Sequence, residues 1–150
     1  MIRDSIKAAL VTAMKGGDKQ KTATIRLIQA AIKNRDIEAR TGKAPADDDT
    51  LVVEVLQEMV KQRRESIELY VKGNRQELAD IEAAEVVVIE EFLPAQMSEE
   101  ETRAAIEAIK AELGATSVKD MGRVMTTLKE RHASSLDMSK ASALVKAALN

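Results

Sequence analysis

The sequence predicts an all-α protein, and three observations support this fold class. Apolar residues recur three and four positions apart through most of the 150 residues, which is the period of an amphipathic helix. No stretch shows the strict alternation of apolar and polar residues that is typical of a half-buried strand. Glycine, proline and helix-capping residues separate the periodic stretches. About four helices are therefore expected before a proline-containing hinge, and about three short helices after it.

The four helices before the hinge are expected to form an N-terminal domain of residues 1–93. Asp4 or Ser5 is the expected N-cap of the first helix, and Asp49 or Thr50 that of the third, because short polar side chains accept hydrogen bonds from free amides at a helix start. The second and fourth helices are expected to bury the periodic residues Ala23, Leu27, Ile28, Ala31, Ile32, Leu78, Ile81, Val88, Ile89 and Phe92.

The stretch "IEEFLPAQMSEEET" predicts the seam between two domains. Pro94 has no amide hydrogen and disfavours helical angles at the preceding residue, so the fourth helix is expected to end before it. Ser98 and Glu101 have the spacing of a capping box, which starts a new helix. A helix start is favoured over an acidic metal or catalytic cluster, because three consecutive glutamates on a helix point in three directions.

A C-terminal domain of residues 97–150 is expected to hold three short helices. Ser117 and Asp120 have the spacing of a second capping box. Gly122 beside the apolar stripe of the next helix would allow a neighbouring helix to approach closely. Asp137 or Ser139 is the expected N-cap of the last helix.

Composition restricts the classes of function. The 23 Lys and Arg against 25 Asp and Glu give a net charge of -2, which offers no global attraction to nucleic acid or to an anionic membrane. Cysteine is absent, which excludes disulfides and cysteine nucleophiles and makes the cytoplasm the default location. The N-terminal segment lacks the apolar centre of a signal peptide, and no stretch is long enough to span a membrane. Because aromatic residues are 1% of the chain, stacking of single-stranded bases is not expected.

No catalytic centre, metal site or cofactor is expected from the residues themselves. His132, Ser134, Ser135 and Asp137 contain the residue types of a nucleophilic triad, but four groups within six positions cannot adopt its separated geometry. The "ADDD" stretch at residues 46–49 lacks the glycine turn and the distal glutamate of a calcium loop, and is expected to be a solvated loop.

Four segments, in this order and spacing, resemble the YqeY-like (GatB/YqeY) family across nearly the whole chain. They are "AMKGGDKQKTATIRLIQAAIKNRDIE", "KQRRESIELYVKGNRQELADIEAAE", "IEEFLPAQMSEEE" and "KDMGRVMTTLK". The resemblance implies an all-helical protein of two domains. It also implies kinship with the tail of GatB, a component of the glutamine-dependent amidotransferases that convert misacylated Glu-tRNA(Gln) or Asp-tRNA(Asn). In those enzymes the tail holds the tRNA body, and the chemistry belongs to other domains and other chains.

One segment departs from the family pattern. The family has a basic, glycine-containing loop before its last helix, whereas the residues between Arg131 and Lys140 include neither glycine nor a positive charge. This difference argues against RNA contact through that loop.

Charge is polarised along the sequence. Residues 15–43 hold eight basic and three acidic side chains, whereas residues 76–112 hold two basic and eleven acidic ones. Residues 119–150 are again basic, with six positive and three negative side chains, so a local basic face is expected, although ordinary solvated helix faces explain the pattern equally well. The candidate nucleic-acid contacts are Lys33, Arg35, Arg40, Arg123, Lys129 and Arg131.

Arg63 and Glu85 are expected to interact with each other. Each lies on the period of an apolar stripe, and a charge turned toward a core needs a partner. A structural ion pair is favoured over a place in a ligand cleft.

The combined expectation is a non-catalytic helical module that binds tRNA or assists a glutamine-dependent amidotransferase. Two alternatives stay open. One is a protein-interaction adaptor that uses the acidic fourth and fifth helices or a groove at the hinge. The other is an auxiliary component of a carbon-nitrogen ligase that takes its nitrogen from glutamine. The sequence names neither the partner nor the oligomeric state.

Overall fold

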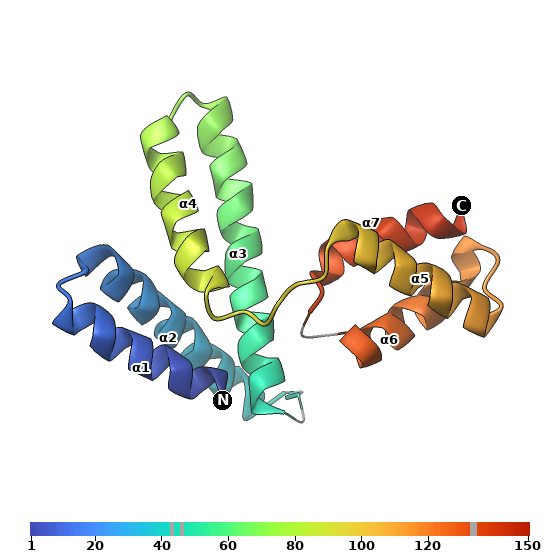
Figure 1. Cartoon of the computed structure of the whole chain (residues 1–150), viewed down its shortest axis with the longest axis horizontal. Coiled ribbons are helices and arrows are strands. Elements are labelled where there is room, and N and C mark those ends of the chain that lie inside the picture. The colour runs from blue at the N-terminus through green and yellow to red at the C-terminus, as the bar shows by residue number, and fades with distance from the viewer. Residues whose placement is uncertain (43, 46, 133–134) are drawn as a thin grey trace. The chain divides into compact units, whose positions relative to one another are not determined.

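All regular structure in the described part of the chain is helical (Figure 1). The computed structural model describes residues 1–42, 44–45, 47–132 and 135–150, and no strand occurs in these ranges, which confirms the all-α prediction for them. None of the described helices is long and apolar enough to cross a membrane. The helices are α1 (Ile2–Lys15), α2 (Lys19–Ala39), α3 (Asp48–Lys72), α4 (Gln76–Glu90), α5 (Glu99–Leu113), α6 (Met121–His132) and α7 (Met138–Leu149), with a 3-10 turn, η1 (Val118–Asp120), before α6.

The chain divides into two compact units, Met1–Leu93 and Pro94–Asn150. Each unit has an aliphatic core of its own. Ile28 and Leu56 are fully buried in the first core, and Leu128 is fully buried in the second. Whether each unit folds without the other stays a prediction.

The first unit is built from two helical hairpins, α1–α2 and α3–α4 (Figure 1). The second hairpin turns at Gly73 and Asn74, and Asn74 adopts the left-handed conformation with φ 57°. Helix α2 packs against both α3 and α4, and Lys21 at its start forms an ion pair of 2.9 Å with Glu91 just after α4. The α3–α4 hairpin rises past α2, so its far end packs only on itself.

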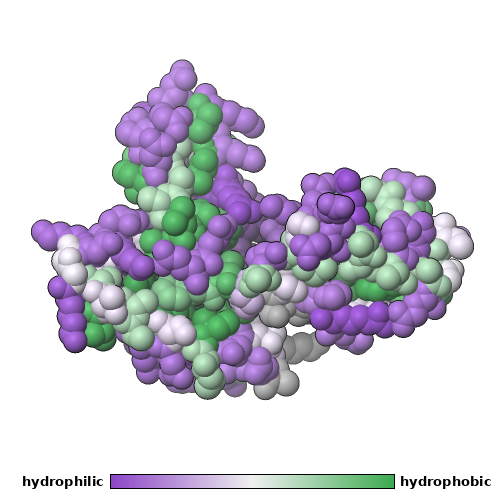
Figure 2. Space-filling model, in the orientation of Figure 1, coloured by the Kyte–Doolittle hydropathy of each residue, from purple (hydrophilic) through white to green (hydrophobic). Residues whose placement is uncertain are grey.

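This geometry corrects three expected core positions, Ile81, Leu27 and Ala23, which are all exposed. Ile81 on α4 is 57% exposed because that part of the hairpin lies beyond α2. Figure 2 shows apolar areas on the surface of this hairpin. Leu27 on α2 is 47% exposed, since it lies about 100° around the helix from the fully buried Ile28 and falls at the edge of the buried face.

The seam has the local structure expected from its sequence. Helix α4 ends at Glu90, before Pro94. At the start of α5 the Glu101 amide donates to Ser98 Oγ at 3.1 Å, and the Ser98 amide donates to a Glu101 carboxylate oxygen at 3.3 Å. Helix α5 ends at Gly114, whose φ of 66° suits glycine.

The second unit differs from expectation at two positions. The Ser117 side chain makes no cap hydrogen bond, because Asp120 instead accepts from the Thr116 amide at 3.0 Å and the chain enters η1. Gly122 does not mark a close helix approach, since a Cβ there would meet no atom within 4 Å. Asp137 Oδ1 accepts from the Lys140 amide at 3.4 Å at the start of α7, while the side chain of the alternative cap, Ser139, lies outside the described part.

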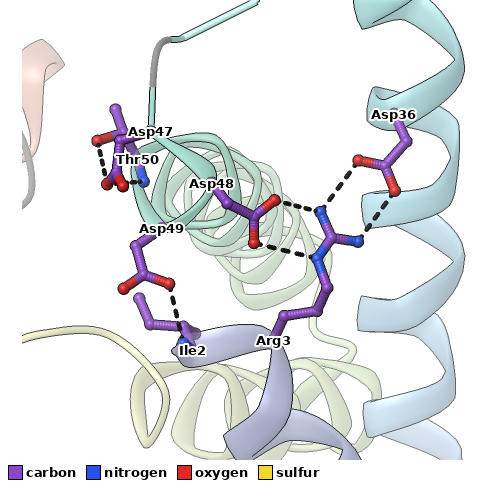
Figure 3. A network of polar contacts seen from close by, with 7 residues as sticks. All are labelled: Ile2, Arg3, Asp36, Asp47, Asp48, Asp49 and Thr50. Atoms are coloured by element: carbon purple, nitrogen blue, oxygen red, sulfur yellow. Dashed lines mark hydrogen bonds and ion pairs between the residues drawn. The ribbon is translucent and has the colours of Figure 1, made fainter.

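The aspartates expected in a solvated loop instead organise the helix starts of the first unit (Figure 3). Asp47 is the N-cap of α3, because one of its carboxylate oxygens accepts from the Thr50 amide at 3.1 Å. Asp49 accepts from the amide of Ile2 at 2.9 Å. That contact explains why α1 begins at Ile2, ahead of the expected caps: a carboxylate of α3 satisfies an amide at its start. Ala46, the first residue of this stretch, lies outside the described residues.

Arg3 joins three helices through one guanidinium group (Figure 3). Its nitrogens donate to both carboxylate oxygens of Asp36 on α2 at 3.0 and 3.1 Å. They also donate to both oxygens of Asp48 on α3 at 2.8 and 3.2 Å. The hydrogen bond from Arg3 lowers the pKa of Asp48, and the bonds to Asp48 and then Asp36 raise the pKa of Arg3. The carboxylate of Asp48 therefore stays ionised to a lower pH than an ordinary aspartate.

Arg63 on α3 and Glu85 on α4 lie side by side. Arg63 Nε donates to a Glu85 carboxylate oxygen at 2.7 Å, and Glu82 lies 3.9 Å away on the same side. The two paired side chains are 15% and 20% exposed, so each charge is partly desolvated and is balanced by the other. This contact joins the two helices of the hairpin where polar residues interrupt both apolar stripes.

The two cores predict that residues 1–93 and 97–150 fold as separate helical domains. Each piece, expressed alone, is expected to give a helical circular dichroism spectrum and a cooperative thermal transition. Two unfolded pieces beside a folded full chain would show that the units depend on each other.

The Arg3 network predicts a pH-dependent stability. The lowered pKa of Asp48 means that its contribution is present above the ordinary value of 3.8 and is lost as the pH falls through the lower pKa of the folded state. Asp48→Asn is expected to cost about 1–2 kcal/mol of unfolding free energy at pH 7, and the difference from wild type should shrink below about pH 4. Denaturant titrations across this range measure it, with Asp80→Asn as the control. A difference that stays constant with pH would contradict this role.

Candidate nucleic-acid interface

The six predicted cations divide between the two units. Lys33, Arg35 and Arg40 belong to α2 or its C-terminal end, whereas the other three, Arg123, Lys129 and Arg131, belong to α6. The two groups differ in how many carboxylates surround them, and this difference decides which of them can meet phosphate.

Arg35 does not share a face with Lys33. Two residues along an α-helix correspond to a rotation of about 200°, so these side chains leave opposite sides of α2. Arg35 is half-buried and lines a groove between α2 and α3, whereas Lys33 is exposed on the other flank. The expected grouping of both cations on one basic face is therefore corrected.

Helix α2 instead carries a straight row of exposed cations, which we call the basic row. Its members are seven residues apart: Lys19, Arg26, Lys33 and Arg40. Seven residues are two turns less about 20°, so the row runs nearly parallel to the helix axis with steps of about 10 Å. In the described part of the chain, no carboxylate lies within ion-pair distance of these four side chains.

Small and apolar residues fill the turns between the cations of the basic row. Ala23, Ala30 and Ile37 occupy these turns, and all three are exposed. The acidic side chains of this region are directed elsewhere, because Asp18 caps α2 and Asp36 is bound by Arg3. This flank of α2 is therefore cationic, and its alanines leave the helix surface open to close approach.

Two members of the basic row, Lys19 and Arg26, were not among the predicted contacts. The period of seven residues that identifies them is present in the sequence. It was missed because net charge by segment does not say which side chains share a face.

The cations of α6 are mostly paired with carboxylates. The guanidinium of Arg131 donates to both oxygens of Glu112 at 2.7 and 2.8 Å, and Arg123 donates to Asp120 at 2.6 Å. The hydrogen bond from Arg131 lowers the pKa of Glu112, and that from Arg123 lowers the pKa of Asp120. Both carboxylates are thus ionised at neutral pH, and a phosphate must compete with them. Lys129 is exposed without such a partner among the described residues.

The segment between α6 and α7 has no triad geometry in its described residues. Ser135 Oγ donates to the carbonyl of His132 at 3.3 Å, a backbone contact rather than one to the imidazole. Ser135 also accepts from the Met97 amide at 2.8 Å through its own carbonyl. Ser134 lies outside the described residues. Across the described ranges, no three His, Asp or Glu side chains are grouped to hold a metal ion.

Comparison with known proteins identifies relatives. A family model described as Yqey-like protein matches residues 3–149. The protein "Altered inheritance of mitochondria protein 41, mitochondrial" of Eremothecium gossypii is 35% identical over 113 residues, which are 74% of this chain and 60% of that protein. The protein of the same name from Pyrenophora tritici-repentis is 31% identical over 142 residues, 90% of this chain and 75% of that protein.

A third relative of that name, from Vanderwaltozyma polyspora, is 34% identical over 88 residues, 59% of this chain and 46% of the relative. The chain thus spans about half the length of several curated relatives it matches. These three relatives carry mitochondrial names, which contradicts the cytoplasmic prediction, and that prediction is wrong. The prediction rested on absent cysteine and an absent signal peptide, and neither feature distinguishes the cytoplasm from a mitochondrion.

Proposed function

The chain belongs to the YqeY-like family, and we propose that it is a non-catalytic helical module. In this proposal it holds the body of a tRNA and assists a glutamine-dependent amidotransferase. The resemblance of this family to the tail of GatB in those amidotransferases supports the proposed role. The names of the relatives support a mitochondrial setting for this role.

The basic row on α2 is the observation that carries the proposal. Four exposed cations span about 30 Å along one flank, a length that can follow a phosphate backbone. The net charge of the chain is -2, so attraction to RNA must come from such a local array. Phosphate contacts of this kind position an RNA without reading its bases.

The amino-acid composition indicates how the chain would bind RNA. With one tyrosine, one phenylalanine and no tryptophan, the chain offers little surface for base stacking, so it recognises folded RNA by its backbone and shape. The carboxylates bound to Arg123 and Arg131 lower the contribution of α6. Affinity is therefore modest and falls steeply as salt rises.

Charge reversal within the basic row tests this role. Arg26→Glu combined with Lys33→Glu is expected to weaken binding of all folded tRNAs alike, by about tenfold or more at about 50 mM salt, and to flatten the salt dependence by about two counterions. Fluorescence anisotropy with labelled tRNA at several salt concentrations measures both effects.

The matched control for this test is Lys61→Glu with Lys72→Glu, which makes the same change in net charge at exposed positions of α3. It should keep most of the affinity, and replacing His132 should matter little. Equal loss in both double variants, or no binding at low salt, would contradict the proposal.

Two alternative functions have separate support. The acidic segment of residues 76–112, with two basic against eleven acidic side chains, favours a protein-interaction adaptor. Family kinship alone favours an auxiliary component of a carbon-nitrogen ligase that uses glutamine. Salt-insensitive capture of a protein would support the adaptor, and glutamine turnover by the pure chain would support the ligase.

A further inference from the structure

A groove of about 370 Å³ lies between α2 and α3 within the first unit. Its floor is apolar and is formed by Ala31, Val55 and Met59. Val55 and Met59 are 8% and 6% exposed and belong to the core, so the floor is held by core packing. Ala31 is small and leaves the space above it open.

Carboxylates dominate the rim of the groove. Glu38 comes from α2, and Glu54 and Glu58 come from successive turns of α3. Arg35 is the one cation among the lining residues, and it already takes part in another interaction. A rim with three carboxylates and one guanidinium has a net negative charge, so it favours a cationic occupant and repels phosphate.

The groove and the basic row lie on different flanks of α2. Ala31 and Glu38 are seven residues apart on the groove side, and Lys33 lies about 200° around the helix from Ala31. Leu27, one turn before Ala31, is 47% exposed and extends the apolar strip along α2. A bound RNA on one flank therefore leaves the other flank accessible.

We propose that this groove binds a short basic amphipathic helix of a partner protein. Along α3 the lining runs from Glu54 to Gln62, about 12 Å or two helical turns, which suits a segment anchored by side chains at i and i+4. The apolar anchors lie on the floor, and flanking Lys or Arg side chains meet the carboxylates of the rim. The inference goes beyond RNA contact and does not depend on it.

A designed peptide provides the probe. It is a capped helix of about 14 residues with leucines at i, i+4 and i+7 and arginines beside them, labelled with fluorescein. Anisotropy titration with the full chain should show saturable binding. A scrambled peptide of the same composition, which lacks the helical period, should bind much more weakly.

Two pairs of glutamates on α3 make a matched comparison. Glu54→Gln with Glu58→Gln removes two charges from the rim, and Glu65→Gln with Glu68→Gln removes two exposed charges of the same helix outside the groove. The rim variant is expected to lose about tenfold in affinity, and the outer variant less than about twofold. Ala31→Leu, which fills the floor without changing charge, should also abolish most of the binding while the thermal melt shows a folded chain.

Several results would overturn the inference. Equal affinity of the rim and outer variants, or full affinity in a folded Ala31→Leu protein, would place the peptide elsewhere. Equal binding of the scrambled peptide would mean unspecific attraction, and displacement by spermidine at equal concentration would mean a site for cations alone. The Arg26→Glu, Lys33→Glu double variant should keep its affinity for the peptide. Its binding therefore distinguishes a failure of the RNA proposal from a failure of the peptide proposal.

Discussion

The guanidinium of Arg3 is the contact on which the arrangement of the first unit depends. It binds Asp36 at the end of α2 and Asp48 at the start of α3 with two hydrogen bonds each, which fixes three helices at one point. At the opposite end of α2, Lys21 is held by Glu91. These contacts fix the two ends of α2, and burial of Ile25, Ile28 and Ile32 in the core sets its rotation. That rotation decides which side chains of α2 are exposed to solvent and which line the groove.

The fixed rotation gives α2 two chemically different flanks. The basic row offers cations separated by small or apolar residues, a surface suited to phosphate, whereas the other flank borders a groove with an apolar floor and an acidic rim. An RNA and a basic peptide would be repelled from each other's surface. One helix therefore offers a separate surface to each of the two proposed partners.

The sequence correctly predicted the features that depend on residues close together along the chain. The helices, the end of α4 before Pro94 and the box of Ser98 with Glu101 depend on residues within one or two turns, and they occur as expected. Three of the other features depend on contacts far along the chain. Asp48 and Asp49 find partners near the N-terminus, 45 and 47 positions away, so a loop was the natural expectation. Ile81 is exposed because the α3–α4 hairpin extends beyond α2. The basic row needed only the seven-residue spacing and could have been found.

The division of α2 into two flanks is tested most directly by photocrosslinking. A photoreactive amino acid at Ala30 of α2 stands between Arg26 and Lys33 in the basic row, and one at Gln62 of α3 lines the groove. Irradiation with tRNA should give a protein–RNA crosslink from position 30 and little from position 62, whereas irradiation with the basic peptide should give the reverse. Equal RNA crosslinking from both positions, or crosslinking from position 62 alone, would contradict the assignment of the two flanks.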